Sequence, residues 1–301
     1  MCGIAGFLGF PLQTDPETVL RDMTQTLAHR GPDDAGLWLD QAAGIALGHR
    51  RLAIVDLSTS GHQPMQSACG RFVCVFNGEI YNHLSLRARL EHQQAGHNWR
   101  GHSDTETLLA CFAHWGIEHT LQQTVGMFAL ALWDKRERLL YLLRDRMGEK
   151  PLYYGWVNGC FAFASELKAF HSLPGFLPEI DRQALASYLR FAYVPAPASI
   201  YQGIHKLPAG HYLVLRAGVK HSQPPELRAW WSLPSTAHLS RLHPVTDEQE
   251  ALHLLKTTLT EATRLQACAD SLSFGRYRLQ YHCSPVTGQQ PATGKNLYGR
   301  F

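Results

Sequence analysis

The 301-residue sequence lacks several features that would place it in a broad class of protein at once. It has no run of lysine and arginine, and its formal net charge is only +3, so we expect neither a nucleic acid nor a membrane as a partner. No apolar stretch approaches the about 20 residues that a membrane-spanning helix needs. The N-terminal segment MCGIAGFLGF has neither the basic start nor the long apolar stretch of a secretory signal.

The seven cysteines show no pattern that would assign them a shared role. They are scattered and odd in number, without metal-ligand spacing or a disulfide framework. The simplest interpretation of Cys69, Cys74, Cys111 and Cys160 is that they are reduced, buried, small apolar side chains. We therefore expect a cytoplasmic protein without a bound metal, while 45% hydrophobic residues are enough for a sizeable core.

Short apolar runs predict a strand-rich region over residues 1–165. The predicted strands are Phe72–Phe76, Met127–Trp133, Leu139–Leu143, Leu152–Tyr154 and Cys160–Ala164. Helical spacing of apolar residues predicts two helices, over Pro16–Leu27 and Thr105–Trp115. Closely spaced strands with separate helices favour antiparallel sheets in a layered α+β domain over a doubly wound parallel fold.

The second half of the sequence predicts a change of domain. A helix is expected at Arg182–Phe191, and another at Asp247–Ala267, where Thr246 and Gln249 form a capping box. Helical periodicity is lost over residues 268–301. We therefore expect one domain over 2–181, a linker and the start of a second domain over 182–267, and an aberrant tail over 268–301.

Cys2 is the first candidate catalytic residue. Removal of Met1 would leave a thiol and an α-amine on one residue, and such an amine can act as base for its own side chain. Its unperturbed pKa of about 7.7–8.0 allows it to accept a proton near neutral pH. From this residue alone, an ordinary buried cysteine is the simpler interpretation.

Five further motifs favour the catalytic interpretation. They are MCGIAGF, HRGPDD at 29–34, LGHRRLAIVDLS at 47–58, FNGEIYNH at 76–83 and GHSDTE at 101–106. In this order and spacing they resemble the class II glutamine amidotransferases, which are N-terminal-nucleophile hydrolases. The resemblance implies a four-layer αββα sandwich of two antiparallel sheets, with L-glutamine as substrate.

The resemblance also implies residues that bind glutamine. Arg51 would hold the substrate carboxylate through its guanidinium fork. Asp104 and Glu79 would receive the substrate ammonium, and Ile54 and Val55 would offer backbone groups.

Catalysis is assigned to three positions in the same way. Cys2 would attack the side-chain amide, while the side chain of Asn77 and the backbone N–H of Gly78 would form the oxyanion hole. Both residues would also contact bound glutamine. Glycine at 78 would let the backbone approach the amide closely.

Simpler roles exist for several of these residues. Arg50 adjoins Arg51, and one of the two arginines could form a surface or structural ion pair. Asp104 could cap the helix that begins at Thr105. Asn77 and Gly78 could form a hairpin turn.

Motifs beyond residue 140 resemble the glutamine-hydrolysing asparagine synthetases in particular. They are RDRMGEKPLYYG at 144–155, SELKAF at 165–170, KLPAGHYL at 206–213 and RLQA at 264–267. In that family a following SGGxDS loop binds the pyrophosphate of ATP, and Mg-ATP activates aspartate for amidation. We therefore expect no cofactor for this chain and Mg-ATP only for an intact relative.

The tail contains no SGGxDS motif. With permitted codons, a one-base shift lets Ser273–Gln280 encode LSGGIDS, and the shifted reading continues without a stop to residue 301. The sequence therefore predicts a frameshift in the gene or its record between about residues 268 and 273; the alternative is a divergent natural tail. Without the loop we expect glutaminase activity at most.

Three rivals stay open: a catalytically silent remnant, a glutamine-binding module, and a relative that amidates a different carboxylate. The sequence leaves the oligomeric state open, with a homodimer as one option.

Overall fold

The computed structural model describes residues 1–9, 14–54, 56–93, 98–219, 225–242, 244–266, 272–274 and 277–279. The strands of the main body are β1 (Gly3–Leu8), β2 (Asp34–Asp40), β3 (Ile45–Arg51), β4 (Met65–Gln66), β5 (Phe72–Ile80), β6 (Gly126–Asp134), β7 (Leu139–Arg144), β8 (Tyr153–Val157), β9 (Cys160–Ala164), β10 (Ile204–Lys206), β11 (His211–Arg216) and β12 (Glu226–Ala229). The helices are α1 (Pro16–Gln25), α2 (His83–His92), α3 (Asp104–Trp115), α4 (Ile117–Gln123), α5 (Arg182–Phe191), α6 (Leu233–Leu242) and α7 (Glu248–Gln266), with short 3-10 turns η1 (Thr59–Gly61) and η2 (Leu167–Ser172).

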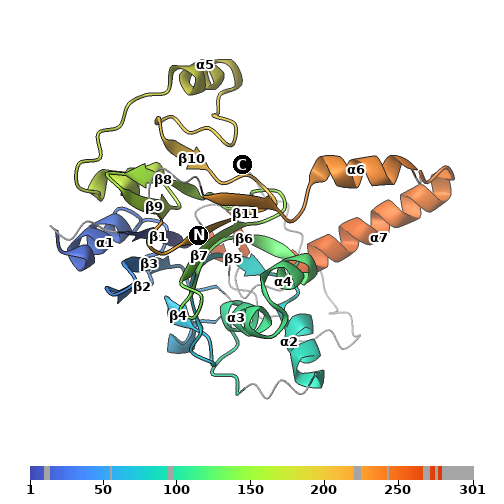
Figure 1. Cartoon of the computed structure of the whole chain (residues 1–301). Coiled ribbons are helices and arrows are strands. Elements are labelled where there is room, and N and C mark those ends of the chain that lie inside the picture. The colour runs from blue at the N-terminus through green and yellow to red at the C-terminus, as the bar shows by residue number, and fades with distance from the viewer. Residues whose placement is uncertain are drawn as a thin grey trace.

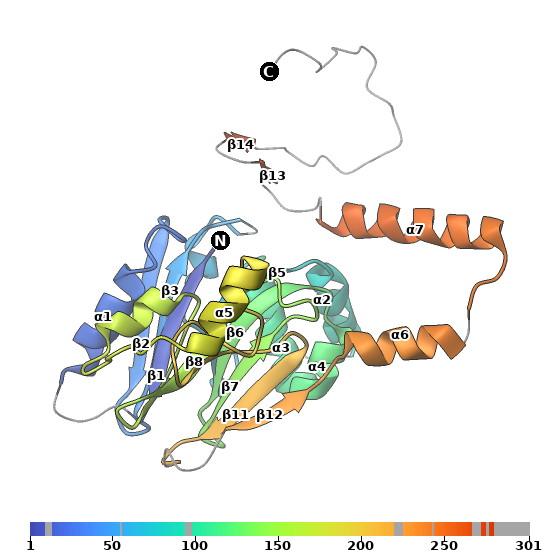
Figure 2. The ribbon, with the colours of Figure 1, turned by 90° about the horizontal axis from the view of Figure 1, so that it is seen from above.

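Two antiparallel sheets of six strands each form the centre of the molecule. Sheet A has the order β10-β8-β9-β1-β3-β2, and sheet B has the order β12-β11-β7-β6-β5-β4. Figures 1 and 2 show the two sheets facing each other, with α1 outside sheet A and α2, α3 and α4 outside sheet B. This confirms the predicted α+β sandwich of two antiparallel sheets with flanking helices.

Strand β6 shows why the sequence forms layers. Its side chains alternate between two faces, as in any strand. Ala129, Ala131 and Trp133 join the core between the sheets. Phe128 and its alternating neighbours pack instead against α2, α3 and α4. A strand that is apolar on both faces must be covered on both sides, so sheet B lies between sheet A and the helices.

The sandwich extends further along the chain than the predicted domain boundary at residue 181. Strand β10 pairs with β8 in sheet A, and β11 pairs with β7 in sheet B. Strand β12 then pairs with β11 and reaches Ala229. The helix at Arg182–Phe191 is present as predicted, but it precedes three strands of the sandwich and does not mark the end of the sheets.

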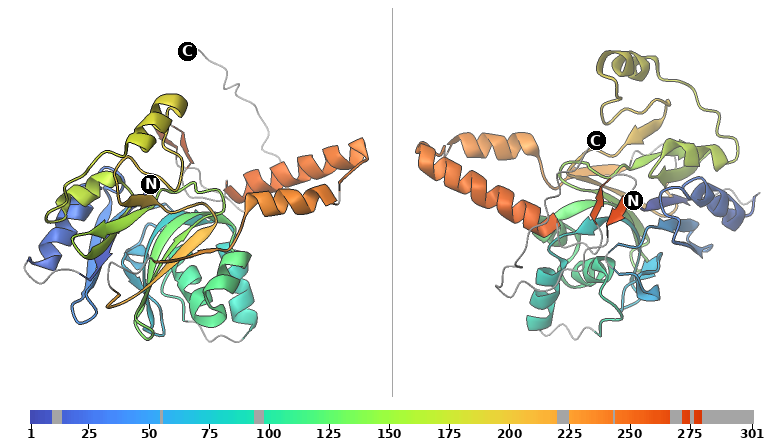
Figure 3. Two further views of the ribbon diagram at one scale, coloured as in Figure 1. Left: turned by 45° about the horizontal axis from the view of Figure 1, so that its top comes forward. Right: turned by 180° about the vertical axis from the view of Figure 1, so that it is seen from behind.

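Helices α6 and α7 project from the sandwich as a pair (Figures 2 and 3). No residue of either helix is buried, and Leu252, Leu255 and Leu259 on α7 are each more than half exposed. The helix cap predicted at Thr246 lies one residue further along the chain. The carboxylate of Asp247 accepts the Glu250 N–H at 2.7 Å, because an aspartate adjacent to the threonine caps a helix equally well.

No helix in the described part of the chain is both long and apolar enough to cross a membrane. Most of the tail at 268–301, including the frameshift hypothesis, lies outside the described residues, apart from the paired strands β13 (Leu272–Phe274) and β14 (Tyr277–Leu279).

Candidate active site

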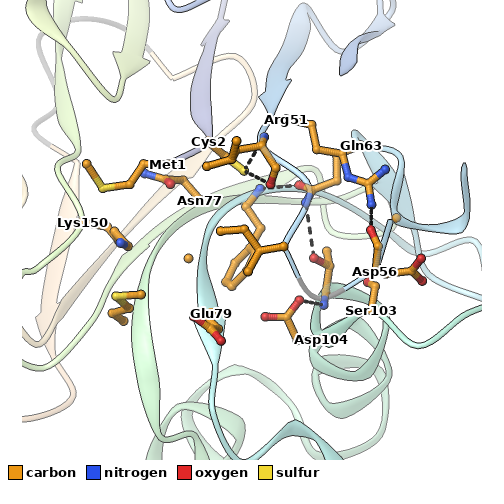
Figure 4. A pocket seen from close by; sticks show the side chains of 17 residues that line it. Met1, Cys2, Arg51, Asp56, Gln63, Asn77, Glu79, Ser103, Asp104 and Lys150 are labelled. Carbon is orange, nitrogen blue, oxygen red and sulfur yellow. Dashed lines mark hydrogen bonds between the residues drawn. The ribbon is translucent and has the colours of Figure 1, made fainter. Parts of the chain in front are cut away.

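A cavity of about 400 Å³ opens where the start of β1, the end of β3, the end of β5 and the N-terminus of α3 meet (Figure 4). The cavity is lined by Met1, Cys2, Arg51, Leu52, Ile54, Asp56, Gly61, Gln63, Phe76, Asn77, Gly78, Glu79, Ser103, Asp104, Thr105, Met127 and Lys150. Seven of the eight residues that the sequence proposed for the site are therefore brought together. The eighth, Val55, lies outside the described residues.

Cys2 is held in place by contacts to its side chain and to its backbone carbonyl. Its Sγ accepts the Leu52 N–H at 3.4 Å. Its carbonyl accepts the Arg30 Nε–H at 2.8 Å, and the same guanidinium donates to Glu166 at 2.8 Å. Burial raises the pKa of the Cys2 thiol, although the Leu52 N–H acts in the opposite direction. The thiol is therefore fixed in place and requires a nearby base to become a nucleophile.

Asn77 lies inside strand β5, opposite Ala129, and not in a hairpin turn. Its side chain is 1% exposed, and its Nδ2 has no hydrogen-bond partner among the described residues. An unsatisfied buried donor costs about 1–3 kcal/mol, so its persistence beside a cavity indicates a use with a ligand.

Gly78 follows in the same strand, and the structure adds a second reason for glycine here. A Cβ at this position would lie 2.3 Å from the Met127 carbonyl oxygen of the neighbouring strand β6. Close strand pairing therefore requires glycine, whatever the approach of a substrate.

Arg51 and Arg50 point to different environments. The Arg51 guanidinium donates to the Ser58 carbonyl at 2.9 Å and to the Asp56 carbonyl, and it lines the cavity. Arg50 donates instead to the Thr24 carbonyl at 3.2 Å, away from the cavity. A guanidinium has five N–H donors, so Arg51 retains donors for an anion after both loop contacts are made.

Asp104 and Glu79 place two carboxyl groups on the floor of the cavity (Figure 4). Asp104 accepts the Ile80 N–H at 2.9 Å and the Thr105 N–H at 2.9 Å. It is not the helix cap, because Ser103 accepts the Glu106 N–H at 3.2 Å and caps α3. Burial raises the pKa of Asp104. Burial and the Asp104 charge raise the pKa of Glu79 to about 7.

Lys150 is a cavity residue that sequence reasoning missed. Lys150 is 7% exposed and lines the cavity. Burial lowers the pKa of this ammonium, and the charge of Lys150 opposes the rise in the Glu79 pKa. The available signal was its motif, RDRMGEKPLYYG, which was used only for the family resemblance.

The backbone of Lys150 is held by its own turn. The Lys150 N–H donates to Asp145 at 3.1 Å, and the Lys150 carbonyl accepts the Arg144 Nε–H at 2.8 Å. In Figure 4, Lys150 and Met1 lie on one side of the cavity and Arg51 with Asp56 on the other. Within the described ranges, no cluster of three or more His, Cys, Asp or Glu side chains could hold a metal ion.

The charge of Glu79 should destabilise the free protein above neutral pH. Burial and Asp104 raise the folded-state pKa of Glu79 from an ordinary 4.5 to about 7. The stability contributed by its bound proton is present below the unfolded value and is lost as the pH rises through 7. Without ligand, Glu79→Gln should therefore raise Tm by about 2–4 °C at about pH 8.5 and leave it unchanged at about pH 4.

Differential scanning calorimetry at both pH values measures this effect. The measurement at about pH 4 is the internal control, because Glu79 there carries its proton in the folded protein and the substitution removes no charge. A Glu79→Gln gain that is the same at low and high pH would contradict the assigned electrostatic cause.

Comparison with known proteins agrees with this geometry. The family described as the glutamine amidotransferase domain matches residues 1–231. Asparagine synthetase [glutamine-hydrolyzing] 1 of Bacillus subtilis strain 168 is 39% identical over 219 residues, covering 72% of this chain and 34% of that protein. Amidase chyE of Penicillium rubens is 34% identical over 281 residues, covering 90% of this chain and 39% of that protein. The chain thus spans little more than a third of these relatives.

A solved structure shares the fold. The glutamine phosphoribosylpyrophosphate amidotransferase from B. subtilis, complexed with ADP and GMP, superposes with a TM-score of 0.54 at 19% identity. The match covers 76% of this chain and 49% of that one, and it supports the sandwich architecture alone. Taken with the match over residues 1–231, the chain belongs to the class II glutamine amidotransferase domain family, close to the asparagine synthetases.

Proposed function

We propose that the chain hydrolyses L-glutamine to glutamate and ammonia, with Cys2 as the nucleophile. The observation that carries the proposal is the unpartnered, buried Nδ2 donor of Asn77 in the cavity that the Cys2 thiol also lines. An N–H donor held ready beside a nucleophile is the arrangement that stabilises a developing oxyanion. A guanidinium and two carboxyl groups in the same cavity complement the two charges of an α-amino acid.

The proposed reaction begins once Met1 has been removed. The freed α-amine of Cys2 takes the thiol proton, and the thiolate attacks the amide carbon of glutamine. The oxyanion that forms is held by Asn77 Nδ2 and the Gly78 N–H. The amine returns the proton to the leaving nitrogen, ammonia departs, and water then hydrolyses the glutamyl thioester to glutamate and free thiol.

Two measurements on the purified chain test this function. Intact-mass spectrometry should show loss of the initiator methionine, and an ammonia assay should show release from L-glutamine but not from D-glutamine. Retention of Met1 would leave the Cys2 nitrogen as an amide without a basic lone pair, and an inactive protein of that kind would favour a glutamine-binding module.

Arg51→Lys should raise KM for glutamine by about 10- to 100-fold and change kcat less than threefold. The contact to the substrate carboxylate is made in both the ground state and the transition state, so its loss appears in KM. A charged hydrogen bond is worth about 1.5–3 kcal/mol, and lysine cannot reproduce the guanidinium fork. Steady-state kinetics of glutamine hydrolysis measure both constants.

Arg50→Lys is the matched control, because Arg50 is adjacent in sequence but contacts Thr24 outside the cavity. It should leave KM within about twofold of the wild type. Equal KM values for the two variants would remove Arg51 from the binding site.

We further propose that the ammonia serves, in a longer protein of this kind, to amidate a carboxylate. Similarity to an asparagine synthetase supports aspartate as the acceptor. Similarity to amidase chyE means that other acceptors stay open. We assign no Mg-ATP step to the described residues, because hydrolysis as written needs none and the sequence carries no SGGxDS loop. Incubating the chain with glutamine, Mg-ATP and aspartate should give ammonia and no asparagine.

A further inference from the structure

We propose that Asp56 is a positioning residue that sets the spacing between the carboxylate-binding and ammonium-binding halves of the cavity. This inference rests on the proposed function. Asp56 is buried at the cavity edge and lies on the same side as Arg51 in Figure 4. Its two carboxylate oxygens act on two different loops.

The first oxygen organises the loop that holds Arg51. Asp56 Oδ1 accepts the Ser58 N–H at 2.8 Å and the Ser58 hydroxyl at 2.6 Å. This turn presents the carbonyls of Asp56 and Ser58 to the Arg51 guanidinium. Hydrogen bonds to Ser58 and His102, together with the Arg51 charge, outweigh burial and lower the pKa of Asp56, so it remains an acceptor-only carboxylate at neutral pH.

The second oxygen reaches the loop that leads into α3. Asp56 Oδ2 accepts the His102 N–H at 3.1 Å. The Ser60 hydroxyl adds a second bridge, donating to the Arg100 carbonyl at 3.2 Å. The two loops approach so closely that a Cβ on Gly101 would lie 2.7 Å from Asp56 Oδ2 and 2.6 Å from the Ser60 Cβ.

The α3 side of this contact is held by further hydrogen bonds. Glu106 accepts the Arg100 N–H at 2.9 Å and the Gly101 N–H at 3.1 Å. Ser103, which caps α3, lies between His102 and Asp104 in the sequence. A path of hydrogen bonds therefore runs from Arg51 through Asp56 to the backbone of His102, two residues before Asp104. Displacement of one loop changes the distance between the groups proposed to hold the substrate carboxylate and ammonium.

This geometry assigns Asp56 a role in recognising the two charged groups together. A ligand with only one of them needs no fixed spacing, whereas glutamine needs both partners at once. Misplacement of about 1 Å can lower the rate about 100-fold when several groups must act together. Loss of the Asp56 contact should therefore weaken the binding of glutamine much more than the binding of analogues that carry a single charged group.

Two variants break the contact from opposite sides. Asp56→Asn keeps an acceptor for Ser58 but turns an N–H₂ donor toward the His102 N–H. Gly101→Ala changes no charge and inserts a methyl group between the loops. Both should raise KM for L-glutamine by about 10- to 100-fold. Inhibition constants of 5-amino-5-oxopentanoate, which lacks the α-ammonium, and 4-aminobutanamide, which lacks the carboxylate, should change less than about threefold.

Asp134→Asn is the matched control, because Asp134 is also buried, also accepts backbone N–H groups (from Arg136 at 3.0 Å) and lies outside the cavity. It should leave the ratio of glutamine KM to both inhibition constants unchanged. If Asp56→Asn and Gly101→Ala weakened the binding of glutamine and of the two analogues equally, the positioning role alone would be overturned. A wild-type chain that releases no ammonia from glutamine would overturn the proposed function, and this inference with it.

Discussion

Replacement of Cys2 by alanine should lower kcat for L-glutamine hydrolysis by at least about 10⁴-fold, because the proposed covalent intermediate is a thioester on this thiol. Three of the described thiols outside the cavity cannot substitute for it, since Cys74, Cys111 and Cys160 are buried in the packed layers. The fold should persist, since Cys2 precedes β1 and its carbonyl contact with Arg30 survives the substitution. Ammonia release and circular dichroism measure the two effects separately.

Cys69→Ala serves as the control for this experiment. Cys69 is the exposed thiol among the described cysteines, and its Sγ lies 3.4 Å from the Ser67 hydroxyl, outside the cavity. Its removal should leave kcat and KM within about twofold of the wild type. If hydrolysis survived Cys2→Ala but not Cys69→Ala, the assignment of Cys2 as the nucleophile would be wrong.

The layered fold was predictable where each strand carries its own signal. Strand β6 reads as continuous apolar sequence with alternating faces, and Met127–Trp133 was predicted inside its observed bounds. Strand β3 carries a weaker local signal, since it ends in the polar residues His49, Arg50 and Arg51. Strands β10 and β11 lie beyond the predicted boundary at residue 181, and their place in the sheets depends on pairing with strands about 50–70 residues earlier, which the local sequence does not reveal.

The candidate site was predictable to the extent that its residues sit in recognisable motifs. Cys2, Arg51, Asn77 and Asp104 line one cavity although about 100 residues separate the first from the last. Their assigned roles remain predictions. Lys150 was missed because its place in the cavity is a property of the folded chain and not of the motif. Asp56 was missed for a related reason, since its partners are backbone N–H groups on two loops.

Asn77→Ala should lower kcat for glutamine hydrolysis by about 100- to 1,000-fold and leave KM within about threefold. The Nδ2 donor is needed only when negative charge develops on the amide oxygen, so its loss appears in kcat. The same substitution should cost little stability, because Nδ2 has no partner in the free protein whose hydrogen bond could be lost. Steady-state kinetics and thermal unfolding of one preparation measure both properties.

Asn82→Ala is the matched control and should lower stability without changing kcat. The Asn82 side chain donates to the Gln123 carbonyl at 2.9 Å and accepts the Val125 N–H at 3.0 Å, outside the cavity. Its loss should lower the free energy of unfolding by about 1–3 kcal/mol and leave kcat unchanged. If Asn77→Ala instead lost stability and kept its kcat, Asn77 would be a structural amide, and the oxyanion would have to be held by the Gly78 N–H or another donor in the cavity.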